Sequence, residues 1–148
     1  MLERLKKIVQ ANKDRVAYKI NNDSISYNKL FERATSLSNA LTSQGTSPVI
    51  LYGHKSVDMV ISIIACLIAK RAYVPIDIYT PMERICKIIK QSKTDLVIKN
   101  EDIKIENIEC LDISVLEEKY NNAGQNIEQK RLLTSPEYQK DGHKYSFM

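Results

Sequence analysis

The sequence predicts an α/β fold with a doubly wound, mainly parallel sheet and flanking helices. Short apolar runs alternate along the chain with longer segments in which apolar residues recur at helical spacing. Strands that alternate with helices pair in parallel through right-handed crossovers. The chain of 148 residues is 43% hydrophobic and 27% charged, which is ordinary for a globular domain large enough to bury a core.

The start of the chain predicts a helix, a hairpin and a second helix. Apolar residues at helical spacing predict the first helix at residues 2–12. A polar cluster typical of a turn separates residues 16–20 from residues 24–26, so these two segments are expected to form a hairpin. Ser26 or its neighbour is expected to cap a long helix that runs to about Ser43.

A buried strand and an apolar helix are expected next. Residues 49–52 are a continuous apolar run, which is typical of a central parallel strand buried on both faces. After the loop at residues 53–55, Ser56 is expected to cap a helix, with Asp58 near the positive end of its dipole. This helix is apolar all round and is therefore predicted to be buried between layers. Its apolar positions are Met59, Val60, Ile63, Ile64, Leu67 and Ile68.

The stretch from residue 66 to residue 89 organises the rest of the chain. A short strand is expected at residues 72–76, and Asp77 closes it. Thr80 is predicted to be the N-cap of the following helix, with Pro81 at its first position and Glu83 completing a capping box. Three residues of this helix are expected to face the core, namely Ile85, Ile88 and Ile89.

Two further strands and one helix complete the expected domain. The strands are predicted at residues 95–99 and 108–111, and Ser114 is expected to cap a helix that runs to about Tyr120. The pattern then stops, and residues 121–148 form a polar tail without a sustained period that we expect to be irregular or disordered. We therefore expect a domain at residues 1–120 and a tail at 121–148.

Composition excludes several classes of function. The net charge of +4 is too mild to indicate nucleic-acid binding. Most of the excess lies near the N-terminus, which is either a solvated helix face or a contact with an anionic partner. The apolar run at residues 59–69 is too short to span a membrane, and the charged N-terminus is unlike a signal peptide, so we expect a cytoplasmic protein.

The cysteines and histidines predict no metal site. Cys66 and Cys86 fall at apolar positions of predicted helices, so we expect both to be buried. The third cysteine, Cys110, lies far from both, and only two histidines occur in the chain. No cluster with metal-ligand spacing results.

Three motifs resemble adenylate-forming (AMP-binding) enzymes. The sequence AYVPID at residues 72–77 is similar to the second core motif of amino-acid-activating members. The sequence ISYNKL at residues 25–30 is similar to the first core motif, with Lys29 where Glu is usual. Between them, LYGHKSVDM at residues 51–59 is similar to the same region of D-alanine:D-alanyl carrier protein ligases. The resemblance covers about residues 14–99.

The resemblance implies an activity that belongs to the intact family. An intact D-alanine:D-alanyl carrier protein ligase uses ATP and Mg²⁺ to form an aminoacyl-adenylate and passes the aminoacyl group to a carrier-protein thiol. The family's phosphate loop is rich in Ser, Thr and Gly, whereas this chain has only four scattered glycines. Residues 133–137 lie near the expected start of that loop but turn to Pro-Glu, which we interpret as a lost or truncated motif.

We therefore expect a truncated N-terminal part of an adenylation domain that does not catalyse alone, with no catalytic residue and no metal ligand. Its expected partners are the missing remainder of the ligase or a carrier protein. Two alternatives remain open. One is a non-catalytic α/β interaction or regulatory module, and the other is a fragment of a peptide-synthetase adenylation domain.

His54 and Lys55 are the candidate ligand-binding residues. They follow a central strand and precede a helix, where open α/β sheets bind ligands and a helix N-terminus attracts anions. The sequence places no nucleophile or orienting carboxylate beside His54. Tyr73, Pro75 and Asp77 either shape the edge of the pocket that the resemblance implies or have structural roles. We favour the structural interpretation, in which Tyr73 fills the core, Pro75 ends a strand and Asp77 fixes a turn.

Overall fold

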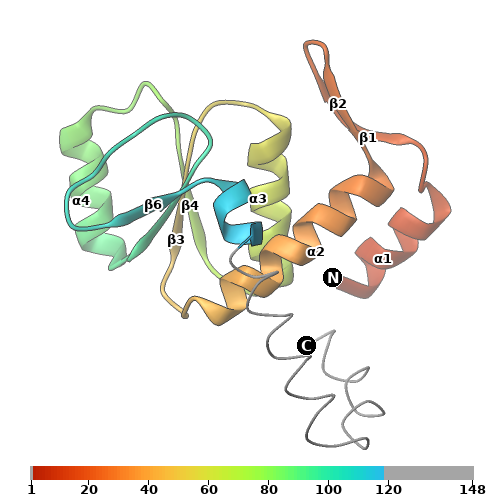
Figure 1. The fold of residues 1–148 in the computed structure, drawn as a ribbon, viewed down its shortest axis with the longest axis horizontal. Helices are drawn as coiled ribbons and strands as arrows, with labels where there is room; N and C mark the ends of the chain where they lie inside the picture. The colour runs from red at the N-terminus through yellow and green to blue at the C-terminus, as the bar shows by residue number, and fades with distance from the viewer. Residues whose placement is uncertain (1, 119–148) are drawn as a thin grey trace, which may run out of the picture.

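The computed structural model describes residues 2–118 of the chain (Figure 1). Ten helices and strands are assigned in this range, and residues 113–118 add a short helical segment. In chain order they are α1 (Leu2–Ala11), β1 (Val16–Ile20), β2 (Asp23–Ser26), α2 (Tyr27–Ser43), β3 (Val49–Tyr52), α3 (Val57–Ile68), β4 (Tyr73–Ile76), α4 (Met82–Ser92), β5 (Leu96–Lys99) and β6 (Glu109–Leu111). The expected elements are all present within this range.

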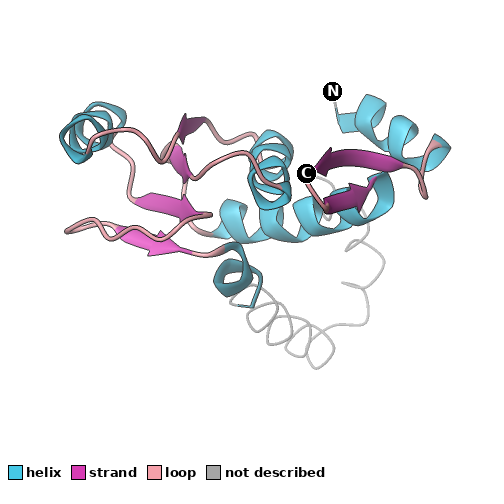
Figure 2. Cartoon of the chain, turned by 90° about the horizontal axis from the view of Figure 1, so that it is seen from above, coloured by secondary structure: helices cyan, strands magenta, loops and turns pink. Residues whose placement is uncertain are grey.

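The main sheet is parallel and has the strand order β4-β3-β5-β6. Strand β3 lies inside, with Val49 opposite Tyr73 on one side and Leu96 on the other. Helix α4 covers one face, and α2 and α3 cover the other (Figure 2). The chain thus winds outward in one direction from β3 to β4 and then crosses over to β5, which confirms the doubly wound fold.

Two hydrophobic cores sit on the two faces of this sheet. Val49 and Leu51 of β3 pack with α2 and α3, whereas Ile50 and Tyr52 pack with α4. All four residues are buried, because alternate side chains of a central strand point to opposite, equally covered faces. The continuous apolar run of this strand is the sequence signature of that environment.

The hairpin β1–β2 is separate from the main sheet and lies beside α1 at one end of the molecule (Figure 1). Its strands are antiparallel, and Asn21 takes the left-handed conformation in the turn, with φ of 52°. Ile25 is buried in the core that α2 and α3 share, so the hairpin is anchored on one side only.

The predicted starts of α2 and α3 are confirmed. The hydroxyl of Ser26 accepts a hydrogen bond from the backbone N–H of Lys29 at 3.2 Å, and that of Ser56 accepts one from Met59 at 3.0 Å. Each serine therefore satisfies one of the amides that a helix N-terminus leaves unpaired.

The predicted cap of α4 is wrong. Pro81, not Thr80, is the N-cap, and no side chain caps this helix. The reason is the preceding turn, in which the Asp77 carboxylate accepts from the N–H of Tyr79 at 3.1 Å and the Asp77 carbonyl accepts from the N–H of Thr80 at 3.0 Å. Thr80 is held in that turn, one residue before the helix begins.

Three other local expectations are corrected. Ser114 does not cap a helix, because the helical segment already includes Ile113 and its first bond runs from the N–H of Leu116 to the carbonyl of Asp112. Cys86 is exposed, because α4 turns Ile85 toward the sheet. Leu67 is 38% exposed. The buried residues of α3 are instead Val57, Ile61, Ser62, Ala65 and Cys66.

Arg71 fixes the amino ends of the strands. Its guanidinium is buried and donates to the carbonyls of Ser47 at 2.8 Å and Leu41 at 3.0 Å, with the carboxylate of Asp95 at 4.0 Å. Burial lowers the pKa of Arg71, and Asp95 opposes that shift. One cation thus links the end of α2 with the segments that lead into β3, β4 and β5. Nearby, burial raises the pKa of the Cys66 thiol to about 12.

None of the helices among residues 2–118 combines the length and apolar composition that crossing a bilayer requires.

Candidate functional site

The candidate site lies at the carboxyl ends of β3, β4 and β5. The N–H of Gly53 donates to the carbonyl of Ile76 at 3.1 Å, and the N–H of Asn100 donates to the carbonyl of Tyr52 at 2.8 Å. These bonds extend the sheet ladder by one residue and hold the three following loops side by side. Open α/β sheets bind ligands at this edge, and the crevice is expected where the winding direction reverses, between β3 and β5.

The structure gives His54 a partner that the sequence did not reveal. Its Nδ1 lies 3.4 Å from an Asp77 carboxylate oxygen, and its ring meets that of Tyr79 edge-on with centroids 6.1 Å apart. The side chains of His54 and Asp77 are about half exposed, at 48% and 51%. A carboxylate in this position orients an imidazole, but in the described structure no hydroxyl or thiol is hydrogen-bonded to His54 for it to activate.

Lys55 does not join this cluster. It is exposed and makes no ion pair within the described range. The two candidate residues therefore differ in setting, since His54 is oriented by Asp77 whereas Lys55 extends into solvent. The interpretation of Asp77 as a turn residue agrees with its bond to Tyr79. Pro75 does not end its strand, because β4 continues to Ile76 and Pro75 is an exposed residue within this edge strand.

The loops that follow β3 and β5 pack closely against each other at Gly53 and Asn100. A Cβ placed on Gly53 would lie 2.8 Å from the Cβ of Asn100 and 3.2 Å from the terminal methyl of Met59. Asn100 also points its amide toward the Met59 sulfur at 3.9 Å. Gly53 is therefore required for close packing of its own chain, not for the close approach of a ligand phosphate.

An open, polar hollow of about 450 Å³ lies beside these loops. Arg33 reaches it from α2 and pairs with Asp58 at 3.4 Å and with Glu117 at 3.8 Å. Lys99 pairs with Asp102 at 3.5 Å. Burial raises the pKa of Glu117, and Arg33 partly offsets that shift. The remaining lining residues include the carboxylates Glu101 and Asp112.

This hollow does not suit a nucleotide. Its two cations are already paired with carboxylates, and further carboxylates surround them, so a polyphosphate would meet like charge. Within residues 2–118, no group of three or more His, Cys, Asp or Glu side chains is placed to hold a metal ion. The residues that the structure describes therefore do not fit ATP with Mg²⁺. The segment at 133–137 lies outside the described residues.

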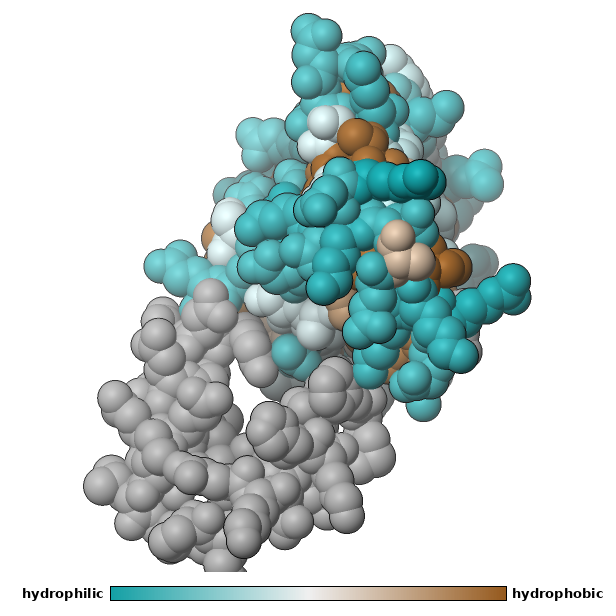
Figure 3. Space-filling model, turned by 90° about the vertical axis from the view of Figure 1, so that its right-hand side faces the viewer, coloured by the Kyte–Doolittle hydropathy of each residue, from teal (hydrophilic) through white to brown (hydrophobic). Residues whose placement is uncertain are grey.

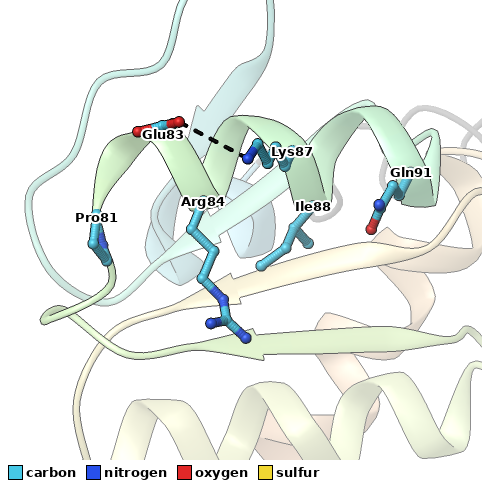
Figure 4. A pocket seen from close by; sticks show the side chains of 6 residues that line it. All are labelled: Pro81, Glu83, Arg84, Lys87, Ile88 and Gln91. Atoms are coloured by element: carbon cyan, nitrogen blue, oxygen red, sulfur yellow. Dashed lines mark ion pairs between the residues drawn. The ribbon is translucent and has the colours of Figure 1, made fainter.

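A second hollow, of about 510 Å³, runs along α4 (Figure 4). Every residue that lines it belongs to this helix or to Pro81 just before it, and the Glu83–Lys87 ion pair at 3.8 Å lies at its border. Because no other element contributes a polar group, it lacks the convergence of side chains that a specific small-molecule site needs. We therefore treat it as an exposed helix face.

The fold defines the class of the protein as an α/β subdomain with a doubly wound parallel sheet, and solved subdomains share this fold. The N-terminal subdomain of NpsA from Klebsiella oxytoca superimposes with a TM-score of 0.68 at 19% identity, covering 78% of this chain and 32% of that one. O-succinylbenzoate coenzyme A synthetase (MenE) from Bacillus subtilis, in complex with AMP, gives 0.68 at 12% identity, covering 77% and 32%. At these identities the likeness concerns the fold alone.

Sequence comparison identifies the family. The model of the AMP-binding enzyme family matches residues 5–144, and the chain belongs to that family. A D-alanine–D-alanyl carrier protein ligase of Bacillus licheniformis is 32% identical over 120 residues, which cover 79% of this chain and 24% of the relative. The same-named ligase of Staphylococcus haemolyticus is 31% identical, covering 76% and 23%. The chain thus spans about a quarter of the length of these relatives.

Proposed function

We propose that this chain forms the N-terminal part of an ATP-dependent ligase that activates D-alanine for transfer to a carrier protein. In that reaction the D-alanine carboxylate attacks the α-phosphorus of ATP and displaces pyrophosphate. The phosphopantetheine thiol of the carrier then attacks the aminoacyl carbonyl and displaces AMP. The observation that carries the proposal is the 32% identity to a D-alanine–D-alanyl carrier protein ligase over 79% of this chain.

We propose further that residues 1–148 do not catalyse either step alone. Adenylation needs cations or backbone amides arranged around the phosphates. The described carboxyl edge of the sheet offers two closely packed loops and a carboxylate-rich hollow instead, and the chain has no glycine-rich loop.

The proposed partners are therefore the remaining part of the ligase and a carrier protein. NpsA–ThdA from Klebsiella oxytoca, an artificially fused adenylation–PCP di-domain, shares the fold of this chain with a TM-score of 0.68 at 19% identity. That fusion is consistent with a carrier-protein partner. The cytoplasmic location stays a prediction.

The first experiment is isothermal titration calorimetry of the purified chain with ATP and Mg²⁺ at millimolar ligand. We expect no saturable heat. Saturable binding would contradict the proposed inactivity, and His54→Ala and Lys55→Ala would then be the first substitutions, with Lys93→Ala on the far end of α4 as a charge-loss control.

The second experiment tests the family activity directly. The chain is co-expressed with the remaining three-quarters of the Bacillus licheniformis ligase, and amino-acid-dependent exchange of pyrophosphate into ATP is measured. We expect exchange with D-alanine that requires both polypeptides. Exchange with another amino acid alone would favour the peptide-synthetase alternative. No exchange, from a complex that does form, would favour a non-catalytic interaction module.

A further inference from the structure

The net charge of this chain is confined to its first 20 residues. These contain six of the 22 Lys and Arg residues and two of the 18 Asp and Glu residues, so the other 128 residues carry sixteen of each sign and are neutral. The six cations are Arg4, Lys6, Lys7, Lys13, Arg15 and Lys19. Such an asymmetry, in a chain that is otherwise balanced, indicates a surface with a preferred sign of partner.

Helix α1 directs two of these cations, Arg4 and Lys7, away from its packed side. Its buried residue is Val9, and Leu5 is half-buried on the same side. At 3.6 residues per turn, Arg4, Lys7 and Ala11 fall on the opposite side, and all three are exposed. The helix therefore packs on α2 through one narrow stripe and presents Arg4 and Lys7 outward. Glu3 lies on the same outward side, is 84% exposed and pairs with Lys6 at 3.8 Å.

The turn after α1 carries two more exposed cations, Lys13 and Arg15, with the exposed Asp14 between them in the sequence. The N–H of Asn28 donates to the carbonyl of Lys13 at 3.1 Å, and the N–H of Tyr27 donates to the carbonyl of Arg15 at 3.0 Å. These bonds tie the turn to the first residues of α2. The cations at positions 13 and 15 are thus exposed side chains on an ordered support.

Two exposed aliphatic residues each follow one of these cations in the sequence. Ile8 is 41% exposed and Val16 is 57% exposed, and both are among the few large hydrophobic residues exposed in the described structure. Figure 3, which faces the end of the molecule that carries α1 and the hairpin, shows scattered hydrophobic side chains surrounded by hydrophilic ones. We define the basic face by six residues, namely Arg4, Lys7, Ile8, Lys13, Arg15 and Val16.

We propose that the basic face is a peripheral contact with an anionic lipid surface. Within the described range its four cations make no ion pairs, so they are available to lipid phosphates. Headgroup phosphates attract the cations and the acyl boundary accepts Ile8 and Val16, while the apolar stripe of α1 stays packed on α2. This contact is independent of the proposed ligase function.

Charge and shape favour lipid over an acidic protein. The basic face is the outer surface of a terminal helix and turn, at the end of the molecule (Figure 1). The hollow near α1, lined by Leu2 and Phe31, is on its inner side against α2. A lipid surface needs no complementary groove, whereas a specific protein contact relies on buried anchors in pockets.

The test is co-sedimentation of the 148-residue chain with vesicles of phosphatidylglycerol and phosphatidylcholine, compared with vesicles of phosphatidylcholine alone. We expect binding to the anionic vesicles only, and weaker binding as salt is raised. The double substitution Lys7→Glu/Arg15→Glu should reduce binding at least about 25-fold, because each cation near an anionic surface contributes about fivefold. Ile8→Ser should reduce it less.

The matched control is Arg84→Glu/Lys90→Glu on α4. Both cations there are exposed and unpaired in the described structure, and either double substitution lowers the formal net charge from +4 to zero. Circular dichroism checks that each variant is folded. The proposal is overturned if wild type binds neither vesicle, if it binds both equally, or if the α4 control loses as much binding as the variant of the basic face.

Discussion

Gly53 determines how closely the loop after β3 approaches the residue after β5. Its φ of 157° is rarely adopted by residues with a side chain, and the space that a Cβ would need is occupied by Asn100 at 2.8 Å. The residue therefore has a packing role at the edge of the sheet where ligands are expected to bind.

Substitution of Gly53 separates conformational strain from steric conflict. Gly45 is the control, because its φ is 120° but nothing lies within 4 Å of its Cβ position. We expect Gly45→Ala to lower the free energy of unfolding by about 1 kcal/mol through strain alone. Gly53→Ala should cost about 1–3 kcal/mol more because it is overpacked against Asn100. Urea denaturation of both variants measures the difference, and equal losses would show that Asn100 moves aside freely.

At the scale of elements, the helices differ in how their N-termini are capped. Ser26 and Ser56 each accept a backbone hydrogen bond three residues into the helix. Helix α4 begins after Pro81 without such a bond, because the Asp77 turn holds the preceding residues. A serine or threonine before a helix therefore caps it only if the incoming chain leaves the hydroxyl over the first turn.

Two alanine substitutions test this difference. Ser56→Ala should lower the free energy of unfolding by about 1 kcal/mol, because the N–H of Met59 loses its acceptor. Thr80→Ala should change it by less than about 0.5 kcal/mol, since no side chain caps α4. Thermal or urea denaturation of the two variants compares them. If Thr80→Ala lowers the free energy of unfolding as much as Ser56→Ala does, Thr80 caps α4 as the capping box predicted.

At the scale of the whole molecule, the described core closes before residue 120. Both faces of the sheet are covered, and Ile113 and Leu116 add the last buried side chains of the core that α2 and α3 share. The division of the chain into a domain at residues 1–120 and a tail at 121–148 stays a prediction. The same division decides whether the tail can cover the surface around α3. The tail itself lies outside the described residues.

Two shortened chains test the division. A chain that ends at residue 120 should have a free energy of unfolding within about 0.5 kcal/mol of the full chain, as expected when no core residue is removed. A control chain that ends at residue 112 loses Leu116, which is fully buried, and should be less stable by about 2–5 kcal/mol. If the first chain is destabilised as much as the control, residues 121–148 are part of the folded domain.

The sequence by itself determined the order of helices and strands, the parallel doubly wound sheet, the caps of α2 and α3, and the family to which the motifs point. These features depend on short-range patterns: the buried run of β3 is four consecutive apolar residues, and Ser56 acts on a residue three positions away. Only the tertiary structure decided the exposure of Cys86, the Arg71 linkage, the pairing of His54 with Asp77, and the close packing of Gly53 against Asn100. The exposure of Cys86 depends on how α4 is rotated about its axis. The other three features bring together residues that are 23 to 47 positions apart. Local periodicity carries no information about either.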